Sequence, residues 1–118
     1  MNDRDKGIVE KIIKYIDDIN DYIDGVEFDS FMLDSKTKAA TAFALGQIGE
    51  LAREIQTSTI EENSHVPWKS MRGMRNRIVH DYENVDLKIL WKTVSTDLPL
   101  LKNQLQELLN VKPPEGTE

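Results

Sequence analysis

Apolar residues recur every three or four positions along most of the chain, and this spacing predicts helices rather than strands. The first such segment, Asp5 to Asp24, has acidic residues between its apolar positions and predicts an amphipathic helix. Its apolar residues are Ile8, Val9, Ile12, Ile13, Tyr15, Ile16, Ile19 and Ile23. A connector from Gly25 to Asp34 has room for a short helical turn, and a second helix is predicted from Ser35 to Thr57.

Two glycines, Gly46 and Gly49, lie in the interior of the second predicted helix. A glycine inside a helix costs about 1 kcal/mol relative to alanine, so a glycine in this position needs a reason. Close approach of another backbone is such a reason. We therefore expect a neighbouring helix, from this chain or from a second copy, to pack tightly against this one.

The second half of the chain predicts further helices and one irregularity. Gln56 to Ser64 is polar and predicts a loop, and Pro67 stands where a third helix would start. Another apolar period covers Val85 to Val94. Pro99 lacks an N–H and clashes with the carbonyl four residues earlier, so we expect a break or kink near Ser95 to Asp97. The apolar positions of the last helix are Leu98, Leu101, Leu105, Leu108 and Leu109.

Together these segments predict an all-α, up-and-down bundle of four to five helices. The 118 residues suffice for one core, and we expect a single helical domain over residues 1–111 and a disordered tail over 112–118. The absence of cysteine excludes a disulfide framework, a thiolate metal site and a cysteine nucleophile. No apolar run approaches the length of a signal sequence or a membrane span, so the expected location is the cytoplasm.

The charge of the chain is unevenly distributed. There are 15 basic and 21 acidic residues, for a formal net charge of −6, which argues against a wholly basic surface for nucleic acid. The segment from Asn63 to His80 nevertheless contains no acidic residue. Its basic residues are Lys69, Arg72, Arg75 and Arg77. This short segment is the candidate contact for an anion.

The same segment contains the side chains that RNA cleavage needs. The ribose 2′-OH is an internal nucleophile, so a group that moves protons near neutral pH and a cation that holds the phosphate are enough, without a metal. His80 is the candidate general acid or base. Arg75, with Arg72 or Arg77, is the candidate for stabilising the phosphate charge. Tyr82 adds a nearby hydroxyl.

Residues 75–82, RNRIVHDY, match the R-x4-H-x-Y motif of the HepT-like proteins, a branch of the HEPN superfamily. Val66, Pro67 and Trp68 before the motif, and Trp91 and the run from Asp97 to Leu100 after it, resemble the same family. The resemblance implies the toxin of a bacterial or archaeal toxin–antitoxin pair. Such a toxin is an endoribonuclease that acts as a homodimer, without a metal or other cofactor.

The resemblance also assigns roles to residues. Arg75 and His80 take the ribonuclease roles, and Asn76 supports the site. Tyr82 is the residue to which the antitoxin, a minimal nucleotidyltransferase of the MntA type, attaches AMP to silence the toxin. An alternative within the same family is a catalytically weak helical binding module that serves as the partner and substrate subunit of the nucleotidyltransferase.

The spacing within the motif raises a geometric question. Five residues on a regular helix correspond to about 500°, so Arg75 and His80 point about 140° apart. Asn76 and His80 lie one turn apart on the polar stripe, whereas Arg75 projects with the apolar one. Either the helix distorts or ends near His80, or the site is assembled in a cleft between two subunits. We favour the cleft, partly by analogy with the family.

Simpler roles stand beside these. His80 can be a solvated helix cap, Arg75 can pair with an acid of the first helix, and Tyr82 can be a core or interface tyrosine. Trp68 and Trp91 have apolar neighbours at helical spacing, which favours core packing over base stacking. The acidic stripe of the first helix (Asp17, Asp21 and Asp24) is typical of a solvated face rather than a metal site.

Overall fold

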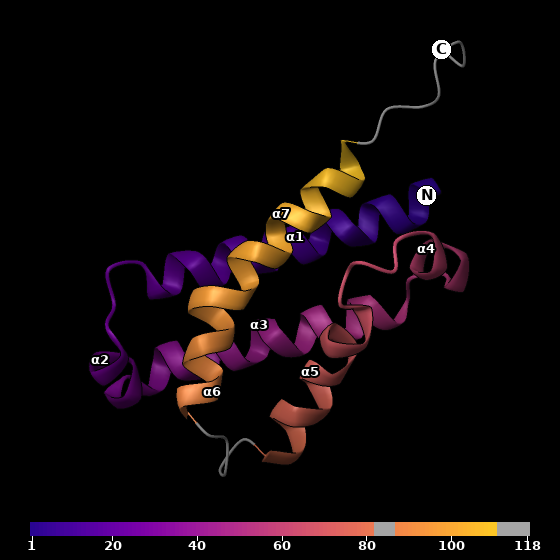
Figure 1. Ribbon diagram of the computed structural model, residues 1–118. Helices are drawn as coiled ribbons and strands as arrows, with labels where there is room; N and C mark the ends of the chain where they lie inside the picture. Colours follow the sequence, from indigo (N-terminus) through magenta and orange to yellow (C-terminus); the bar gives the residue numbers. More distant parts are fainter. Residues whose placement is uncertain (82–86, 111–118) are drawn as a thin grey trace.

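The computed structural model describes residues 1–81 and 87–110, and for residues 76–81 it describes the backbone only. Every regular element of the described chain is a helix, in agreement with the predicted all-α bundle (Figure 1). In chain order, the elements are α1 (Asp3–Ile23), α2 (Phe28–Leu33), α3 (Ser35–Arg53), α4 (Thr57–Glu62), α5 (Trp68–Asp81), α6 (Leu87–Lys92), the π-helical segment η1 (Thr93–Asp97) and α7 (Leu98–Leu109). The predicted tail at 112–118 lies outside the described residues.

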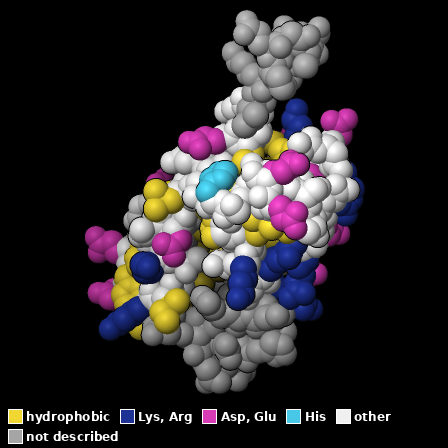
Figure 2. Space-filling view, turned by 45° about the vertical axis from the view of Figure 1, so that its right-hand side comes forward, with side chains coloured by type: hydrophobic (Ala, Val, Ile, Leu, Met, Phe, Trp, Pro, Cys, Tyr) yellow, Lys and Arg dark blue, Asp and Glu magenta, His cyan; other side chains and the backbone are white. Residues whose placement is uncertain are grey.

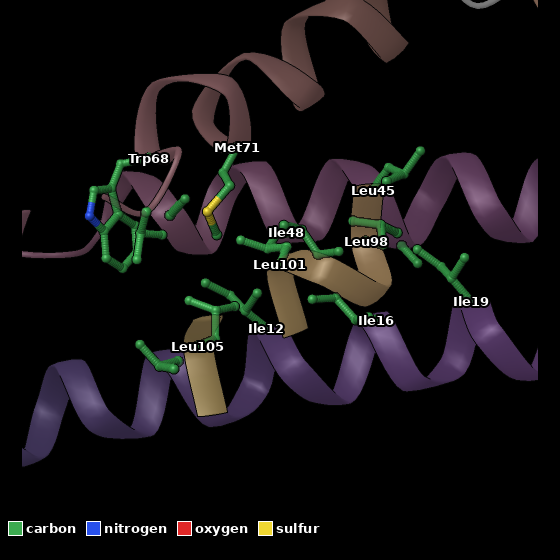
Figure 3. Close-up of a cluster of buried hydrophobic side chains, with 14 of the residues drawn as sticks. Ile12, Ile16, Ile19, Leu45, Ile48, Trp68, Met71, Leu98, Leu101 and Leu105 are labelled. Carbon is green, nitrogen blue, oxygen red and sulfur yellow. The ribbon is translucent and has the colours of Figure 1, made fainter. Parts of the chain in front are cut away.

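Helix α3 is the centre of the bundle. It packs against α1 and against α5, while α7 packs across α1 (Figure 1). Apolar side chains from these helices meet in one core, and Figure 3 shows how α1, α3, α5 and α7 contribute to it. The fully buried members include Ile12, Ile16, Ile19, Leu45, Ile48, Met71, Leu98 and Leu105. The helical period of the sequence therefore identified the packing faces correctly.

Side chains from just before each helix cap the first two long helices. The Asn2 side chain accepts a hydrogen bond from the backbone N–H of Asp5 at 2.7 Å, at the start of α1. Asp34 caps α3, where its carboxylate accepts bonds from the Thr37 hydroxyl at 2.6 Å and from the Thr37 N–H at 3.0 Å. These two bonds, the hydroxyl first, lower the pKa of Asp34.

The expected loop over Gln56 to Ser64 is wrong, because α4 forms within it. The reason is a buried carboxylate from near the N-terminus, in α1. Asp5 is fully buried in α1, and its Oδ2 accepts a bond from the Thr59 hydroxyl at 2.6 Å and a longer one from the Gln56 N–H at 3.3 Å. A hydrogen-bond acceptor for the Gln56 N–H and the Thr59 hydroxyl stabilises the first turn of α4. Because a distant residue supplies this acceptor, the local sequence does not reveal it.

The irregularity expected from Pro99 is confirmed at the predicted place. The chain does not break there but continues through η1, the π-helical turn that separates α6 from α7. The Leu98 N–H bonds the carbonyl of Thr93, five residues back. This wider turn lets the helix continue although Pro99 has no N–H to donate. None of the described helices is long and apolar enough to cross a membrane.

Both tryptophans pack in or against the core, as predicted. Trp68 is 3% exposed, and its indole N–H donates to the Asn63 carbonyl at 3.0 Å. Trp91 packs against the core beside Phe31, with 5.0 Å between the ring centroids. Neither ring is therefore available as an open platform for stacking a base.

Candidate functional site

The basic segment identified in the sequence forms α5, and its first turn is held firmly in the core. Pro67 immediately precedes the helix, and its carbonyl accepts the first helical bond from the Met71 N–H at 3.0 Å. Trp68 and Met71 are buried against α3, so the start of α5 cannot easily slide or rotate (Figure 3). The predicted start near Pro67 is confirmed, and the basic side chains extend from a fixed helix.

Arg75 forms an ion pair with an acid of α3. Its Nε lies 2.6 Å from Oε1 of Glu50. Arg75 was expected to be able to pair with an acid of the first helix. Its partner is instead an acid of α3, because α5 packs against α3. The Arg75 side chain is 45% exposed and that of Glu50 is 50% exposed. The guanidinium is thus anchored on one nitrogen while about half of its side chain faces solvent.

Gly49, next to Glu50, explains how α5 comes so close to α3. A Cβ at Gly49 would lie 2.8 Å from the backbone nitrogen of Arg75 and 3.1 Å from the carbonyl oxygen of Met71. No side chain fits between the two backbones at this point, so the predicted close approach is confirmed within one chain. A Cβ at Gly46 would meet no described atom within 4 Å. The reason for Gly46 is thus not found in the described part of this chain.

Arg72, one turn before Arg75, contacts the end of α3. Its Nε donates to the carbonyl oxygen of Ala52 at 3.2 Å, in the last turn of that helix, where the same carbonyl also accepts the Ile55 N–H at 3.4 Å. Lys69 is exposed on the same stretch of α5. Figure 2 shows Lys and Arg side chains gathered where the described surface borders the grey residues. Lys69 and Arg75 of the basic segment are thus exposed at the surface.

The remaining motif residues are described only in part. The backbone of Asn76, Arg77 and His80 belongs to α5, but their side chains lie outside the description, and Tyr82 lies outside it entirely. The backbone of α5 is α-helical from Trp68 to Asp81, so the helix does not distort before His80 but ends one residue after it, as one of the alternatives predicted. The Cα atoms of Arg75 and His80 are therefore about 140° apart around the helix axis, as on any regular helix.

Glu50 is the residue that the sequence analysis missed. It is the one acid within α3, and it directly follows the glycine that marks the close approach. That juxtaposition was the available signal: an acid beside a helix crossing can reach a cation on the partner helix. Among the described side chains, no group of three or more His, Asp, Glu or Cys residues could hold a metal ion.

Comparison with known proteins gives consistent matches over most of the chain. A family model described as "Ribonuclease HepT-like" matches residues 12–108. A protein from Thermococcus cleftensis named "Probable ribonuclease HepT" is 35% identical over 103 residues, which cover 87% of this chain and 94% of that protein.

Two further relatives carry the name "Putative RNase". One, from Methanocaldococcus jannaschii, is 32% identical over 90% of this chain and 98% of its own length. The other, from Caldanaerobacter subterraneus, is 31% identical over 86% of this chain and 90% of its own length. No solved structure gave a significant match. The matches thus cover α5 with its motif as well as the helices that support it.

Proposed function

Because the chain belongs to the HepT-like ribonuclease family, we propose that it is a metal-independent endoribonuclease and the toxin of a toxin–antitoxin pair. The observation that carries this proposal is Arg75, which is half-exposed yet anchored, on a basic helix five residues before His80. A cation held in this way suits a phosphate, whose charge increases in the transition state of cleavage.

The proposed reaction is attack of a ribose 2′-oxygen on the adjacent phosphorus. His80 takes the proton from the 2′-OH or returns one to the departing 5′-oxygen, and a bond from phosphorus to the 2′-oxygen replaces the bond to the 5′-oxygen. Arg75 stabilises the charge on the phosphate oxygens, supported by Asn76, Arg72 and Arg77. Arg72 contacts the end of α3 through Nε, one turn before Arg75.

We place the site in a cleft between two copies of the chain. Arg75 and His80 do not share a face of α5, so a second surface is needed to bring both groups to one phosphate. The supporting observation is the face of α3 that leads to Glu50. On that face Phe43 is 57% exposed, and Gly46, three residues on, lacks a neighbour among the described atoms that would explain it. An exposed aromatic side chain beside a bare helix backbone suits close packing against a second copy.

A charge on this face tests the dimer. Phe43→Glu should turn a dimer into a monomer in size-exclusion chromatography with light scattering, because an acid on each copy would be buried opposite its equivalent. Leu33→Glu is the matched control, since Leu33 is 87% exposed on a different helix, α2. A monomeric Phe43→Glu variant that cleaves RNA at the normal rate would contradict the shared cleft. So would a wild-type chain that is monomeric.

Tyr82 is the proposed off switch. Its hydroxyl oxygen would attack the α-phosphorus of ATP on an MntA-type nucleotidyltransferase, and pyrophosphate would leave. The attached AMP adds negative charge and bulk at a residue seven positions after Arg75 and two after His80 in the sequence, so it would compete with the substrate phosphate. Intact mass after incubation with the nucleotidyltransferase and ATP should show whole AMP units, and Tyr82→Phe should show none. Silencing of Tyr82→Phe by the partner would contradict this assignment.

The second candidate is a catalytically weak binding module that presents itself to the nucleotidyltransferase. Cleavage itself distinguishes the two. His80→Ala should lose at least about 100-fold in rate, the usual contribution of a general acid or base. If His80→Ala keeps full toxicity in a host cell, the nuclease proposal fails and the binding module is favoured.

A further inference from the structure

We propose that Glu50 is a positioning residue for RNA cleavage: through its ion pair with Nε, it orients the Arg75 guanidinium toward the substrate phosphate. This inference rests on the proposed function. It adds to the R-x4-H-x-Y motif a residue from a different helix, which no spacing within the motif could indicate. The contact joins α3 to α5 at 2.6 Å.

The first argument is that both ends of this contact are fixed. Glu50 follows Gly49, where the backbones of α3 and α5 are so close that a Cβ would lie 3.1 Å from the Arg75 Cβ. The carboxylate and the guanidinium therefore start from two backbones whose relative position is set by packing. A long side chain such as arginine is normally free to rotate, and here its Nε has a defined partner at a defined place.

The second argument is that the Arg75–Glu50 ion pair contributes little to the stability of the fold. Both side chains are about half-exposed, at 45% and 50%, and ion pairs at such positions contribute little to folding because water and salt screen them. Orientation is a different matter. A guanidinium has five N–H donors, and the contact with Glu50 uses the Nε donor, so the four donors on the terminal nitrogens are the ones that suit a phosphate.

The third argument concerns the charge of the carboxylate, which opposes that of the substrate. A bare acid beside a phosphate-binding site weakens RNA binding, so an acid there needs a compensating benefit. Positioning of Arg75 is such a benefit, and it needs an acceptor rather than a charge. The amide oxygen of glutamine can accept a hydrogen bond from the Arg75 Nε at the same place without repelling the phosphate. This difference separates the two effects of Glu50 experimentally.

The experiment compares kcat and KM for a mixed-sequence RNA labelled with a fluorophore and a quencher. Glu50→Ala should lower kcat by about 10- to 100-fold, the range expected when a supporting partner is lost and a reacting group is misplaced. Glu50→Gln should keep most of kcat and show an unchanged or lower KM. Glu50→Met, which keeps the length of the side chain without a strong acceptor, should behave like Glu50→Ala and serves if the alanine variant is poorly folded.

A second ion pair provides a matched control. Asp17 of α1 and Lys102 of α7 are also 2.6 Å apart, and the Asp17 side chain is 47% exposed. Asp17→Ala therefore removes an acid of similar exposure from a similar contact between other helices. It should leave kcat unchanged while shifting the melting temperature about as little as Glu50→Ala does. In an Arg75→Ala background, Glu50→Ala should cause no further loss, since it acts through Arg75.

The outcomes distinguish this inference from the proposed function. If the wild type cleaves and His80→Ala does not, but Glu50→Ala keeps the wild-type kcat, the assignment of Glu50 is overturned and the proposed function stands. Equal losses in Glu50→Gln and Glu50→Ala would also overturn it, because an acceptor would then be insufficient. If the wild-type chain does not cleave RNA at all, the proposed function fails and the role of Glu50 fails with it.

Discussion

Replacing Gly49 by alanine should destabilise the bundle, although alanine is the better helix former. The new Cβ would lie 2.8 Å from the Arg75 nitrogen and 3.1 Å from the Met71 oxygen, and both are backbone atoms that cannot rotate away. Carbon contacts in well-packed interiors are about 3.5–4.0 Å, so the Arg75 nitrogen would have to move away by about 0.7 Å or more. Overpacking of this kind costs about 1–3 kcal/mol.

Gly46→Ala provides the comparison that isolates this cost. Both substitutions gain about 1 kcal/mol of helix propensity, and only the Cβ at Gly49 meets described atoms within 4 Å. The gain therefore cancels between the two variants. Gly49→Ala should have a free energy of unfolding about 1–3 kcal/mol lower than that of Gly46→Ala.

The assay is urea unfolding followed by far-ultraviolet circular dichroism, at one protein concentration for the wild type and both variants. Light scattering on the same samples checks their assembly, because Gly46 lies on the proposed dimer face. Equal stability of the two alanine variants, with equal assembly, would refute the reasoning. It would mean that the crossing of α3 and α5 tolerates a methyl group and that Gly49 is not required there.

Three further substitutions test other contacts. Asp5→Ala should lower the free energy of unfolding by about 1–3 kcal/mol in urea unfolding, because it leaves the buried Thr59 hydroxyl and the Gln56 N–H without their acceptor; a neutral result would contradict the stabilisation of α4 by Asp5. The pKa of Asp34 is lowered from its ordinary value of 3.8, so its bonds to Thr37 stabilise the folded chain at pH values above 3.8. This stability is lost as the pH falls through the folded-state pKa. Asp34→Asn should therefore be less stable than the wild type at neutral pH and converge with it in acid, and a constant difference would contradict the Thr37 cap. Arg72→Ala should lower the free energy of unfolding by about 1 kcal/mol in urea, and an unchanged midpoint would show that its bond to α3 is not needed.

Local pattern predicted the long helices well, because each buries one face of a regular period. Most of the assigned positions in α1 and α7 are buried: Ile8, Ile12, Ile16, Ile19, Leu98, Leu101, Leu105 and Leu108. The assigned residues Ile13, Ile23 and Leu109 are partly buried against the same core. Pro99 was equally informative, since a missing N–H acts on the same turn in which it occurs. Its outcome was a wider turn and not a break, and that choice depends on how α6 and α7 pack into the bundle.

Features that depend on distant partners could not be predicted. Helix α4 is stabilised by Asp5, whose side chain lies more than fifty residues earlier in the sequence. The Gly49 signal indicated a close approach without saying which helix approaches, so the partner of Arg75 was assigned to the wrong helix. Packing of α5 on α3 settles this, and it brings Glu50 to a residue that the motif had already singled out.

The most direct measurement is cleavage of a mixed-sequence RNA by the purified chain in excess EDTA, with the wild type, Arg75→Ala and His80→Ala compared side by side. The wild type should cleave the RNA internally without a metal, and each variant should be at least about 100-fold slower while keeping a native circular dichroism spectrum. Wild-type activity that disappears in EDTA, or cleavage that survives in His80→Ala, would contradict the proposed chemistry.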